Sequence, residues 1–461
     1  MYAYGLTSGL IAINSAISNV VNVAQPEDYM DEIFHVRQAQ QYCCGNFSAW
    51  DPKITTPPGV YFLGVAWAKI LQPLRLVWPR VVYCSTPVLR AMNASLGVMG
   101  FFLCHSLLRA NFPNASSSTV ALRCFLVFFF PVYFTYMFLF YTDVASVCLV
   151  LLMLLMAVKK RPMLSQVVGC ISVTVRQSNI IWTAYAAFLG MLAMSKDKRP
   201  AKQNQGFTHE PVDFLLWTKQ HPMDSLRVVL PCAIVWCLSF SFTVWNGGVA
   251  FGDRDAQTAR LHLVQVMYCT TFAFLSMAPA LADPSIAVLI FGAVRTSLRK
   301  SPMICMTLTA MLLMFILYAV KYHTYAHPYL LADNRHIIFY LWKDVIRPFK
   351  WYLVPVYAVS FIGLLLLLGA GSYGHVSSQW PKLQAAALLA CVSASVVPYP
   401  LLELRYFIMP VICVMVQVRP SRPSVALVHI ACFVLMDAFM LYLFTRRNFV
   451  YADGSVGRII W

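Results

Sequence analysis

Long apolar runs separated by short polar stretches recur along the whole 461-residue chain. A helix that crosses the hydrocarbon core of a bilayer needs about 20 mostly apolar residues, and many of these runs approach that length. The pattern predicts an all-α polytopic membrane protein, a single integral-membrane domain over residues 1–461 with about 12–14 transmembrane helices. We expect them near residues 3–23, 83–108, 123–140, 143–158, 164–175, 178–194, 226–246, 262–280, 302–320, 351–370, 383–397, 405–418 and 424–444.

Two connections between these runs are long. Residues 24–82 form a first loop, in which "MDEIFHVRQAQQY" at 30–42 has the pattern of a helix that rests on the membrane surface. Residues 58–74 are apolar but contain prolines, which favours an interfacial or re-entrant helix over a span. The second long connection covers residues 195–225, and we expect it to be cytoplasmic.

Composition agrees with the membrane class. Hydrophobic residues make up 59% of the chain and charged residues only 11%, against roughly 25% charged in soluble domains, and the mean hydropathy is +0.65. The fourteen cysteines lie mostly inside apolar runs, where a thiol behaves as a small hydrophobe, so no disulfide framework can be read from them. No metal-ligand spacing occurs.

The net charge of +17 is carried by short basic clusters between the apolar runs. Lysine and arginine are typically retained in cytoplasmic loops, which explains these clusters better than a nucleic-acid partner does. Nucleic-acid binding is therefore not expected, and the clusters orient the chain. They lie at 159–161, 196–202 and 295–300 and at Arg419 with Arg422.

This orientation places the chemically interesting polar stretches on the opposite, non-cytoplasmic face. An enzyme or a transporter with a single vestibule requires such segregation, and a structural protein does not. Of the sequons at Asn46, Asn93 and Asn114, only Asn46 lies clearly in a loop of this face. The stretches are the acid-rich segment 26–59, "YTD" at 141–143, "RQSN" at 176–179, "NGGVAFGDRD" at 246–255, "ADNRH" at 332–336 and "LELRY" at 402–406.

The acid-rich segment holds four of the 18 acidic residues within six positions, among them Asp31 and Glu32. The ordinary account of such a pair is a helix cap in a solvated loop. The functional account is a general base, because partial desolvation at the rim of a bilayer raises the pKa of a carboxyl towards neutrality. Asp51, Asp143 and Asp333 are alternative bases on the same face.

Five basic residues lie on the face that carries these acids. Each alone is explained by a side chain that extends from a span end towards water. Together they indicate recognition of an anion, and the planar fork of arginine suits phosphate. No G-x-x-x-x-G-K-[ST] motif is present, so nucleotide binding is not expected. The five are Arg176, Arg254, Arg335, His336 and Arg405.

Two functions fit this arrangement: an enzyme that acts on a phosphorylated, lipid-borne ligand, and a lipid-phosphate or sugar transporter or flippase. Transporters tend to show inverted repeats or chains of acids within their spans. The sequence shows neither pattern. The enzyme is therefore the favoured interpretation.

Seven motifs in series resemble the dolichyl-phosphate-glucose-dependent α-1,2-glucosyltransferases of the endoplasmic reticulum. The resemblance covers residues 28–461, with departures at Val175, at Ser178 and in a short loop at 196–225. It implies a GT-C bundle with its active site at the luminal face of the membrane. The motifs are "YMDEIFHVRQAQQYC", "WDPKITTPPGVY", "RQSNIIW", "NGGVAFGDR", "LLADNRHIIFYLW", "PLLELRYFIMP" and "RIIW".

The resemblance also implies substrates and roles. The donor would be dolichyl phosphate glucose, and the acceptor the diglucosylated, nine-mannose oligosaccharide on dolichyl diphosphate. Asp31 would be the base, and Glu32 its orienting neighbour or an acceptor ligand. We expect no metal or other cofactor, because arginine can meet the phosphate. The expected donor-phosphate and substrate-binding residues are Arg335, His336 and Arg405, with Arg176, Gln177, Arg254, Asp333 and Asn334.

Overall fold

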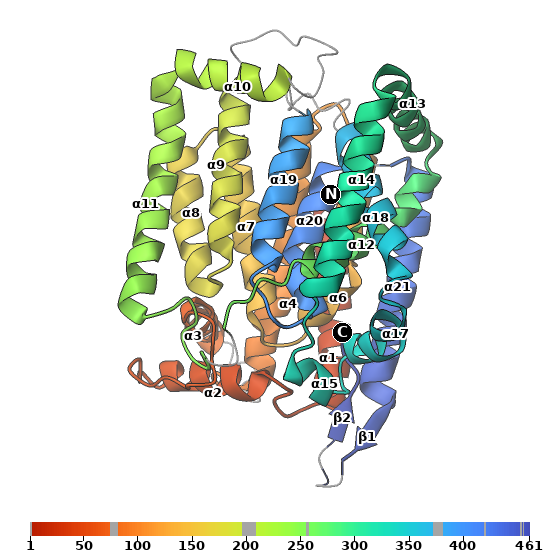
Figure 1. The fold of residues 1–461 in the computed structure, drawn as a ribbon. Helices are drawn as coiled ribbons and strands as arrows, with labels where there is room; N and C mark the ends of the chain where they lie inside the picture. The colour runs from red at the N-terminus through yellow and green to blue at the C-terminus, as the bar shows by residue number, and fades with distance from the viewer. Residues whose placement is uncertain are drawn as a thin grey trace.

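The computed structural model describes residues 2–73, 82–195, 209–254, 258–371, 381–418, 421–451, 454 and 456–461. Most helices run roughly along one axis and form an all-α bundle (Figure 1), which confirms the predicted fold class. Every expected span is helical. They are α1 (Tyr2–Ala24), α4 (Thr86–Asn111), α5 (Ser117–Phe128) with α6 (Pro131–Tyr136), α7 (Thr142–Val158), α8 (Pro162–Val175), α9 (Asn179–Ser195), α11 (Pro222–Asn246), α12 (Val264–Met277), α14 (Pro302–Tyr322), α18 (Leu353–Gly371), α19 (Pro381–Val396), α20 (Ile408–Gln417) and α21 (Pro423–Arg446).

Length and apolar composition separate most of these helices into two groups. Among the described residues, five helices are long and apolar enough to cross a membrane: α4, α11, α12 with its 3₁₀ extension η3 (Ala278–Ala282), α14 and α21. A sixth would be the bent pair Ile337–Phe349 and Leu353–Gly369. Several other expected spans are apolar helices of 10–17 residues. The multi-pass class is confirmed, and the expected 12–14 spans include these shorter helices.

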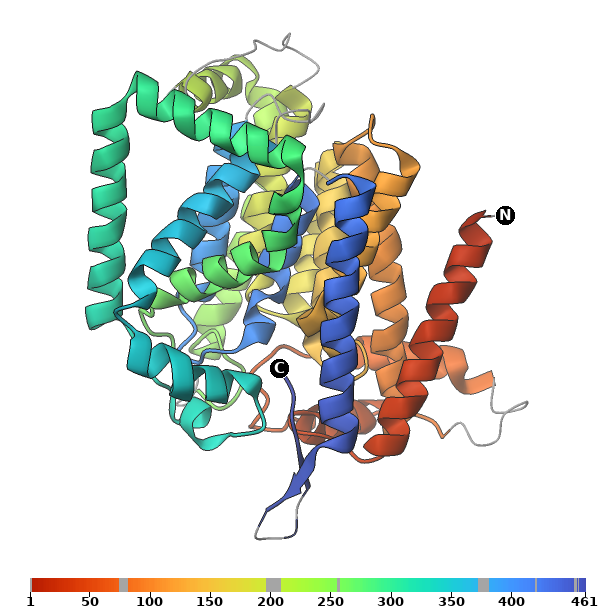
Figure 2. The ribbon, with the colours of Figure 1, turned by 90° about the vertical axis from the view of Figure 1, so that its right-hand side faces the viewer.

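Some elements were not predicted. The amphipathic helix α13 (Pro284–Lys300) lies across one end of the bundle (Figure 2) and contains residues 295–300, expected to be a loop. It begins there because Pro284 occupies its first turn and the carboxylate of Asp283 accepts a hydrogen bond from Ser285 N at 2.9 Å. Helix α10 (His209–Gln220) lies in the expected cytoplasmic loop, whose residues 196–208 are outside the described residues. Strands β1 (Asn448–Val450) and β2 (Val456–Arg458) form a small antiparallel hairpin.

The polar loops predicted to share a face meet at the end of the bundle opposite α10 and α13 (Figure 1). Helix α2 (Glu32–Cys43) lies across this end, as expected of a surface helix, and α3 (Gly59–Leu71) lies beside it. The loops are joined by backbone hydrogen bonds such as Phe251 N to Thr55 O and Arg260 N to Pro398 O. Further short elements complete this end: α15 (Pro328–Ala332), α16 (Ile337–Leu341), η4 (Trp342–Ile346), α17 (Arg347–Phe349) and the 3₁₀ turn η5 (Leu404–Phe407).

The segment 129–141 interrupts the expected span 123–140 and enters the core. The chain breaks before Pro131, whose ring carries no N–H, and α6 then starts with this proline in its first turn. Helix α4 approaches the segment closely at two glycines. A Cβ on Gly97 would lie 2.5 Å from the sulfur of Met137, and one on Gly100 would lie 2.7 Å from the hydroxyl of Tyr133. A side chain at either position would therefore require the side chain of Met137 or of Tyr133 to move.

A disulfide joins Cys43 at the end of α2 to Cys84 just before α4. The sequence interpretation, in which no disulfide could be read, missed this bond. Cys84 stands at the edge of an apolar run and resembles a span cysteine, although the fold brings it to the same end as Cys43. The neighbouring Cys44 is exposed and free. The bond fixes α2 against the start of α4, 41 residues further along the chain.

Candidate active site

Glu32 and Arg90 form a buried ion pair at the base of the site. The two side chains are 0% and 1% exposed. Arg90 on α4 donates to both carboxylate oxygens of Glu32, at 2.9 and 2.6 Å, and its remaining N–H groups donate to Asn22, Gln25 and Glu27. Five N–H groups thus meet five acceptors, which is the full donor capacity of a guanidinium.

Both oxygens of the Glu32 carboxylate accept further hydrogen bonds. Besides Arg90 it accepts from the backbone N–H of Tyr29 at 3.0 Å and of Phe140 at 2.6 Å. No part of the carboxylate faces the vestibule. The expectation that Glu32 orients Asp31 or binds the acceptor therefore disagrees with this geometry, in which Glu32 ties α2 to α1, α4 and the turn at 140. Sequence reasoning missed Arg90, which lies inside an apolar run 58 residues away.

Asp31, the adjacent acid, is partly exposed and pairs with a different arginine. Its side chain is 42% exposed and accepts a hydrogen bond from Arg405 Nη1 at 2.8 Å. It stands at the N-cap of α2 but makes no capping hydrogen bond through its side chain, so the helix-cap account does not describe it. Its backbone N–H donates to the hydroxyl of Tyr141 at 3.1 Å, which fixes the first turn of α2 against the 141 turn.

Arg405 and Arg176 line one polar pocket with about 350 Å³ of empty space. Arg405 also pairs with Glu403, and Arg176 pairs with Asp143 at the start of α7. The guanidinium groups of Arg405 and Arg176 lie 5.5 and 5.4 Å, respectively, from the ring centre of Tyr406. Among the described residues, Nη2 of Arg405 and Nη2 and Nε of Arg176 have no hydrogen-bond partner, so both arginines retain donors for an anion.

The charges around Asp31 decide its protonation. Burial raises the pKa of the Asp31 carboxyl, but the charge of Arg405, with smaller contributions from His35 and His336, more than offsets this effect and leaves the pKa below its ordinary value. The sequence-based expectation of a pKa raised towards neutrality was therefore wrong in direction. His35, one turn along α2, has its pKa lowered by burial to about 4 and is neutral at physiological pH. Asp31 is thus ionised and able to accept a proton.

A second cluster forms at residues 333–336. Arg335 donates from Nε and Nη2 to the two oxygens of Asp333, both at 2.8 Å. Burial raises the pKa of the Asp333 carboxyl, but the hydrogen bonds and charge of Arg335 together with the charge of His336 more than offset burial and lower the pKa overall. Nδ1 of His336 lies 2.7 Å from Trp461 O, and Asn334 accepts from the hydroxyl of Tyr451 at 2.7 Å.

The other expected residues have different surroundings. Gln177 donates to Thr55 O at 2.9 Å and so joins the α8–α9 turn to the first loop. Arg254 is exposed and donates to Asn246 at 3.0 Å, with no contact to the two clusters among the described residues. The structure therefore brings together Asp31, Arg405 and Arg176, places the cluster at 333–336 at the same end, and leaves Arg254 outside.

Two of the three alternative bases are less exposed than Asp31. Asp143 is 2% exposed in its pair with Arg176, and Asp333 is 22% exposed in its pair with Arg335. Asp51 accepts from the backbone of Lys53 at 2.9 Å. The accessible, ionised carboxylate beside the arginine pocket is Asp31, which suits proton acceptance next to an anionic leaving group. Among the described residues, no group of three or more His, Cys, Asp or Glu side chains could hold a metal ion.

Sequence reasoning missed other residues of the site. Glu403 and Tyr406 flank Arg405 within the quoted "LELRY" motif. Tyr406 is an aromatic ring of the kind that can hold an arginine in place, and no charge marks it in the sequence. The signal that could have found both residues is position, since both lie within two residues of Arg405.

The fold and the site define a multi-pass membrane protein with one pocket of paired arginines and carboxylates at one end of its bundle. Residues 25–416 match the DIE2/ALG10 family, and the chain belongs to this family. The resemblance seen in the motifs is thereby confirmed, and with it the assignment to a glucosyltransferase family.

Three relatives illustrate the match. Each is described as "Dol-P-Glc:Glc(2)Man(9)GlcNAc(2)-PP-Dol alpha-1,2-glucosyltransferase". The protein from Arabidopsis thaliana is 32% identical, with 96% of this chain and 97% of the relative covered. Those from Rattus norvegicus and Homo sapiens are 33% and 30% identical, each with 94% of this chain and 93% of the relative covered. No solved structure matches the chain.

The geometry of the two adjacent acids generates a prediction about stability. Glu32→Gln should lower the free energy of unfolding by about 3–5 kcal/mol, because it leaves the Arg90 charge buried without its partner. Asp31→Asn should change the free energy of unfolding by less than about 1 kcal/mol, since the ion pair of Asp31 with Arg405 is partly exposed. Thermal melting in detergent measures both, with the exposed Glu27→Gln as the control. Equal losses for Glu32→Gln and Asp31→Asn would contradict the structural role of Glu32.

Proposed function

We propose that this chain transfers glucose from dolichyl phosphate glucose to the diglucosylated, nine-mannose oligosaccharide on dolichyl diphosphate. The product would carry a terminal α-1,2-linked third glucose. The observation that carries the proposal is the pairing of Asp31, an accessible carboxylate, with Arg405 at the edge of a pocket that Arg176 also lines. The names of the relatives, which specify this donor and this acceptor, support the choice of the two substrates.

The proposed reaction is a single displacement that inverts the anomeric carbon, because a β-linked donor gives an α-linked product. Asp31 accepts the proton of the acceptor 2-hydroxyl as that oxygen attacks the anomeric carbon of glucose. The bond between this carbon and the phosphate oxygen breaks, and dolichyl phosphate leaves with the bonding electrons. The ionised state of Asp31 supports this role.

The leaving phosphate is already a stable anion, so it needs no general acid. It needs positive charge on its oxygens as the bond breaks. Arg405 and Arg176 are the candidates that the pocket supports, because both have unused N–H groups. Arg335 and His336 are candidates for the same phosphate from the neighbouring cluster, where Nη1 of Arg335 makes no hydrogen bond to the described residues. We propose that the reaction requires no metal.

The location that we propose is the membrane of the endoplasmic reticulum, with the site facing the lumen. The disulfide of Cys43 with Cys84 lies at the end of the bundle that carries Asp31. Disulfides persist in oxidising compartments such as this lumen. The basic clusters 159–161 and 295–300 lie towards the other end, as cytoplasmic loops would.

The main experiment uses purified protein in detergent, without any sealed compartment. Glucose should move from dolichyl phosphate glucose to the two-glucose acceptor, whereas a transporter or flippase has no measurable activity without two sides. Addition of EDTA should leave the rate nearly unchanged, because arginines meet the phosphate. Absence of transfer would refute the proposed function, and a rate abolished by EDTA and restored by manganese would refute the metal-free mechanism.

The role of Asp31 predicts a specific loss. Asp31→Asn keeps the size of the side chain but removes proton acceptance, so kcat should fall by about 10²–10⁴ while donor binding changes little. Arg405→Ala should weaken donor binding as well as kcat. Single-turnover transfer and donor titration measure both, with Glu27→Gln as the control. Near-normal turnover by Asp31→Asn would move the role of base to another acid at this end.

The orientation of the protein in the membrane can be tested with two exposed sequons, which lie at opposite ends of the first spans. Asn46 lies after α2 at the end that carries Asp31, and Asn114 lies between α4 and α5 at the other end. In cells, Asn46 should carry a glycan that an endoglycosidase removes and that Asn46→Gln abolishes. Asn114→Gln should change nothing. A glycan at Asn114 would show that the site faces the cytoplasm.

A further inference from the structure

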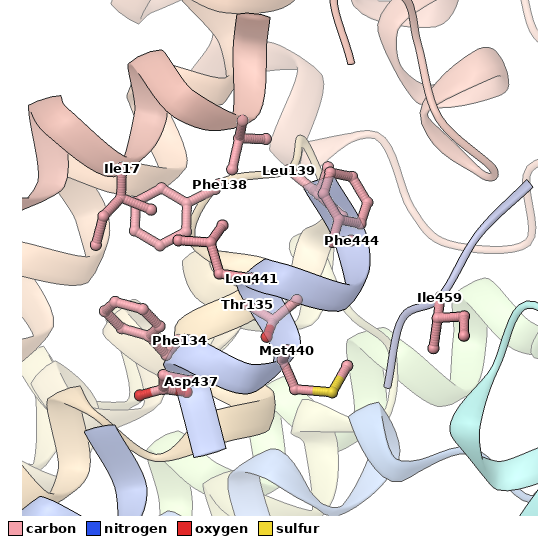
Figure 3. A pocket seen from close by; sticks show the side chains of 11 residues that line it. Ile17, Phe134, Thr135, Phe138, Leu139, Asp437, Met440, Leu441, Phe444 and Ile459 are labelled. Atoms are coloured by element: carbon pink, nitrogen blue, oxygen red, sulfur yellow. The ribbon is translucent and has the colours of Figure 1, made fainter. Parts of the chain in front are cut away.

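An apolar pocket lies between α1, α6 and α21 (Figure 3), and its empty space, counted together with the open solvent at its mouth, is about 410 Å³. Its walls are almost wholly apolar: α1 contributes Val21, the segment after α6 contributes Phe138, and α21 contributes Leu441 and Phe444. Ile459, which follows strand β2, also lines it. This pocket is separate from the arginine pocket described above, and the proposed mechanism does not use it.

The segment 131–141 is the partition between the two pockets. Phe138 lines the apolar pocket, whereas the hydroxyl of Tyr141 accepts a hydrogen bond from the backbone N–H of Asp31 at 3.1 Å. The ring of Tyr141 lies 5.6 Å from the guanidinium of Arg405, which holds Asp31. The apolar pocket and the proposed catalytic carboxylate therefore contact the same short segment.

Polar groups surround the end of the apolar pocket that is nearest the site. Phe444 packs edge-on against Tyr29 at 5.5 Å and under the guanidinium of Arg458 at 5.7 Å. Ile459 precedes Ile460, which pairs with His336 in a short parallel bridge. A molecule with an apolar chain in this pocket would thus present its head to the end of the bundle that carries Asp31.

We propose that this pocket binds the first isoprene units of the donor, dolichyl phosphate glucose, an assignment that rests on the proposed function. The chemistry of the two lipids decides between them. In the donor, the phosphate that carries the chain is bonded to the reacting carbon, so the chain must begin within a few bonds of Asp31. In the acceptor, the whole oligosaccharide separates the reacting hydroxyl from the lipid, so its chain need not approach this place.

Asp437 on α21 gives the proposal a discriminating test. It lines the pocket, is 6% exposed, and neither carboxylate oxygen has a hydrogen-bond partner among the described residues. An isoprenoid chain offers no hydrogen-bond donor, so it gains nothing from this carboxyl group. Asp437→Leu should then improve the use of the long-chain donor, whereas a polar occupant of the pocket would be lost in this variant.

The pocket fixes the position of the chain more than it supplies affinity. Lipid tails are as apolar as the walls of the pocket, so transfer of the chain from the bilayer yields little hydrophobic free energy. The gain comes from packing and from holding the phosphate in line with the acceptor hydroxyl. We therefore expect filling of the pocket to lower kcat/KM for long-chain donors in particular.

The experiment compares two tryptophan variants on the same helix. Leu441→Trp fills the pocket, and Leu435→Trp, whose side chain is 70% exposed on the outer surface of α21, is the matched control. Transfer is measured with glucosyl phosphate donors of one isoprene unit and of a long dolichyl chain. Leu441→Trp should reduce the preference for the long chain on the order of tenfold relative to the control. Asp437→Leu should increase that preference, because it removes the carboxyl group from the pocket wall.

A second measurement does not depend on the folding of any variant. A donor analogue with a diazirine on its second isoprene unit should label wild-type residues within 134–139 and 437–444, and dolichyl phosphate should prevent the labelling. Any one of four results would overturn the proposal. Two of them are labelling confined to other helices and an unchanged chain-length preference in folded Leu441→Trp. The other two are loss of transfer in folded Asp437→Leu and a raised KM for the acceptor instead of the donor. Absence of transfer by the wild type would instead refute the proposed function.

Discussion

The buried ion pair of Glu32 with Arg90 is the constraint on which the active end of the molecule depends. Removal of two charges from water is costly and is offset only when every donor and acceptor is satisfied, as it is here. The partners of the pair come from the end of α1, from α2, from α4 and from the turn at Phe140. One interaction therefore holds in register four segments that would otherwise meet only through loops.

The position of Asp31 follows from this constraint. Because its neighbour Glu32 is locked inward, and because successive residues of a helix point about 100° apart, Asp31 is turned towards the vestibule. There it meets Arg405, which lies 374 residues further along the chain. The result is a site of alternating charges, in which each arginine is neutralised by carboxylates yet keeps donors for an incoming phosphate. Such preorganised donors stabilise developing charge without rearrangement during the reaction.

The sequence predicted those features of the fold that a local pattern of residues reveals. Apolar runs predicted the helices and the class, and basic clusters predicted that the polar loops would gather at one end. It did not reveal Arg90, which stands inside an apolar run, or Cys84, which stands at the edge of one, because their partners are distant in the chain. The direction of the Asp31 pKa shift was missed for the same reason. Burial is visible in a local pattern, but the opposing charge of Arg405 comes from another part of the fold.

Segment 131–141 links the two environments that a lipid-linked sugar must occupy at once. Its break before Pro131 replaces a continuous span by a short helix and a turn, so that one side meets apolar walls and the other meets Arg405 and Asp31. Gly97 and Gly100 allow α4 to pack against it without a gap. A straight helix of the expected length would place its polar residues only at its ends. The broken helix instead places Tyr141 against Arg405 and Asp31 while Phe138 lines the apolar pocket, which is the arrangement that the proposed transfer from a membrane-borne donor requires.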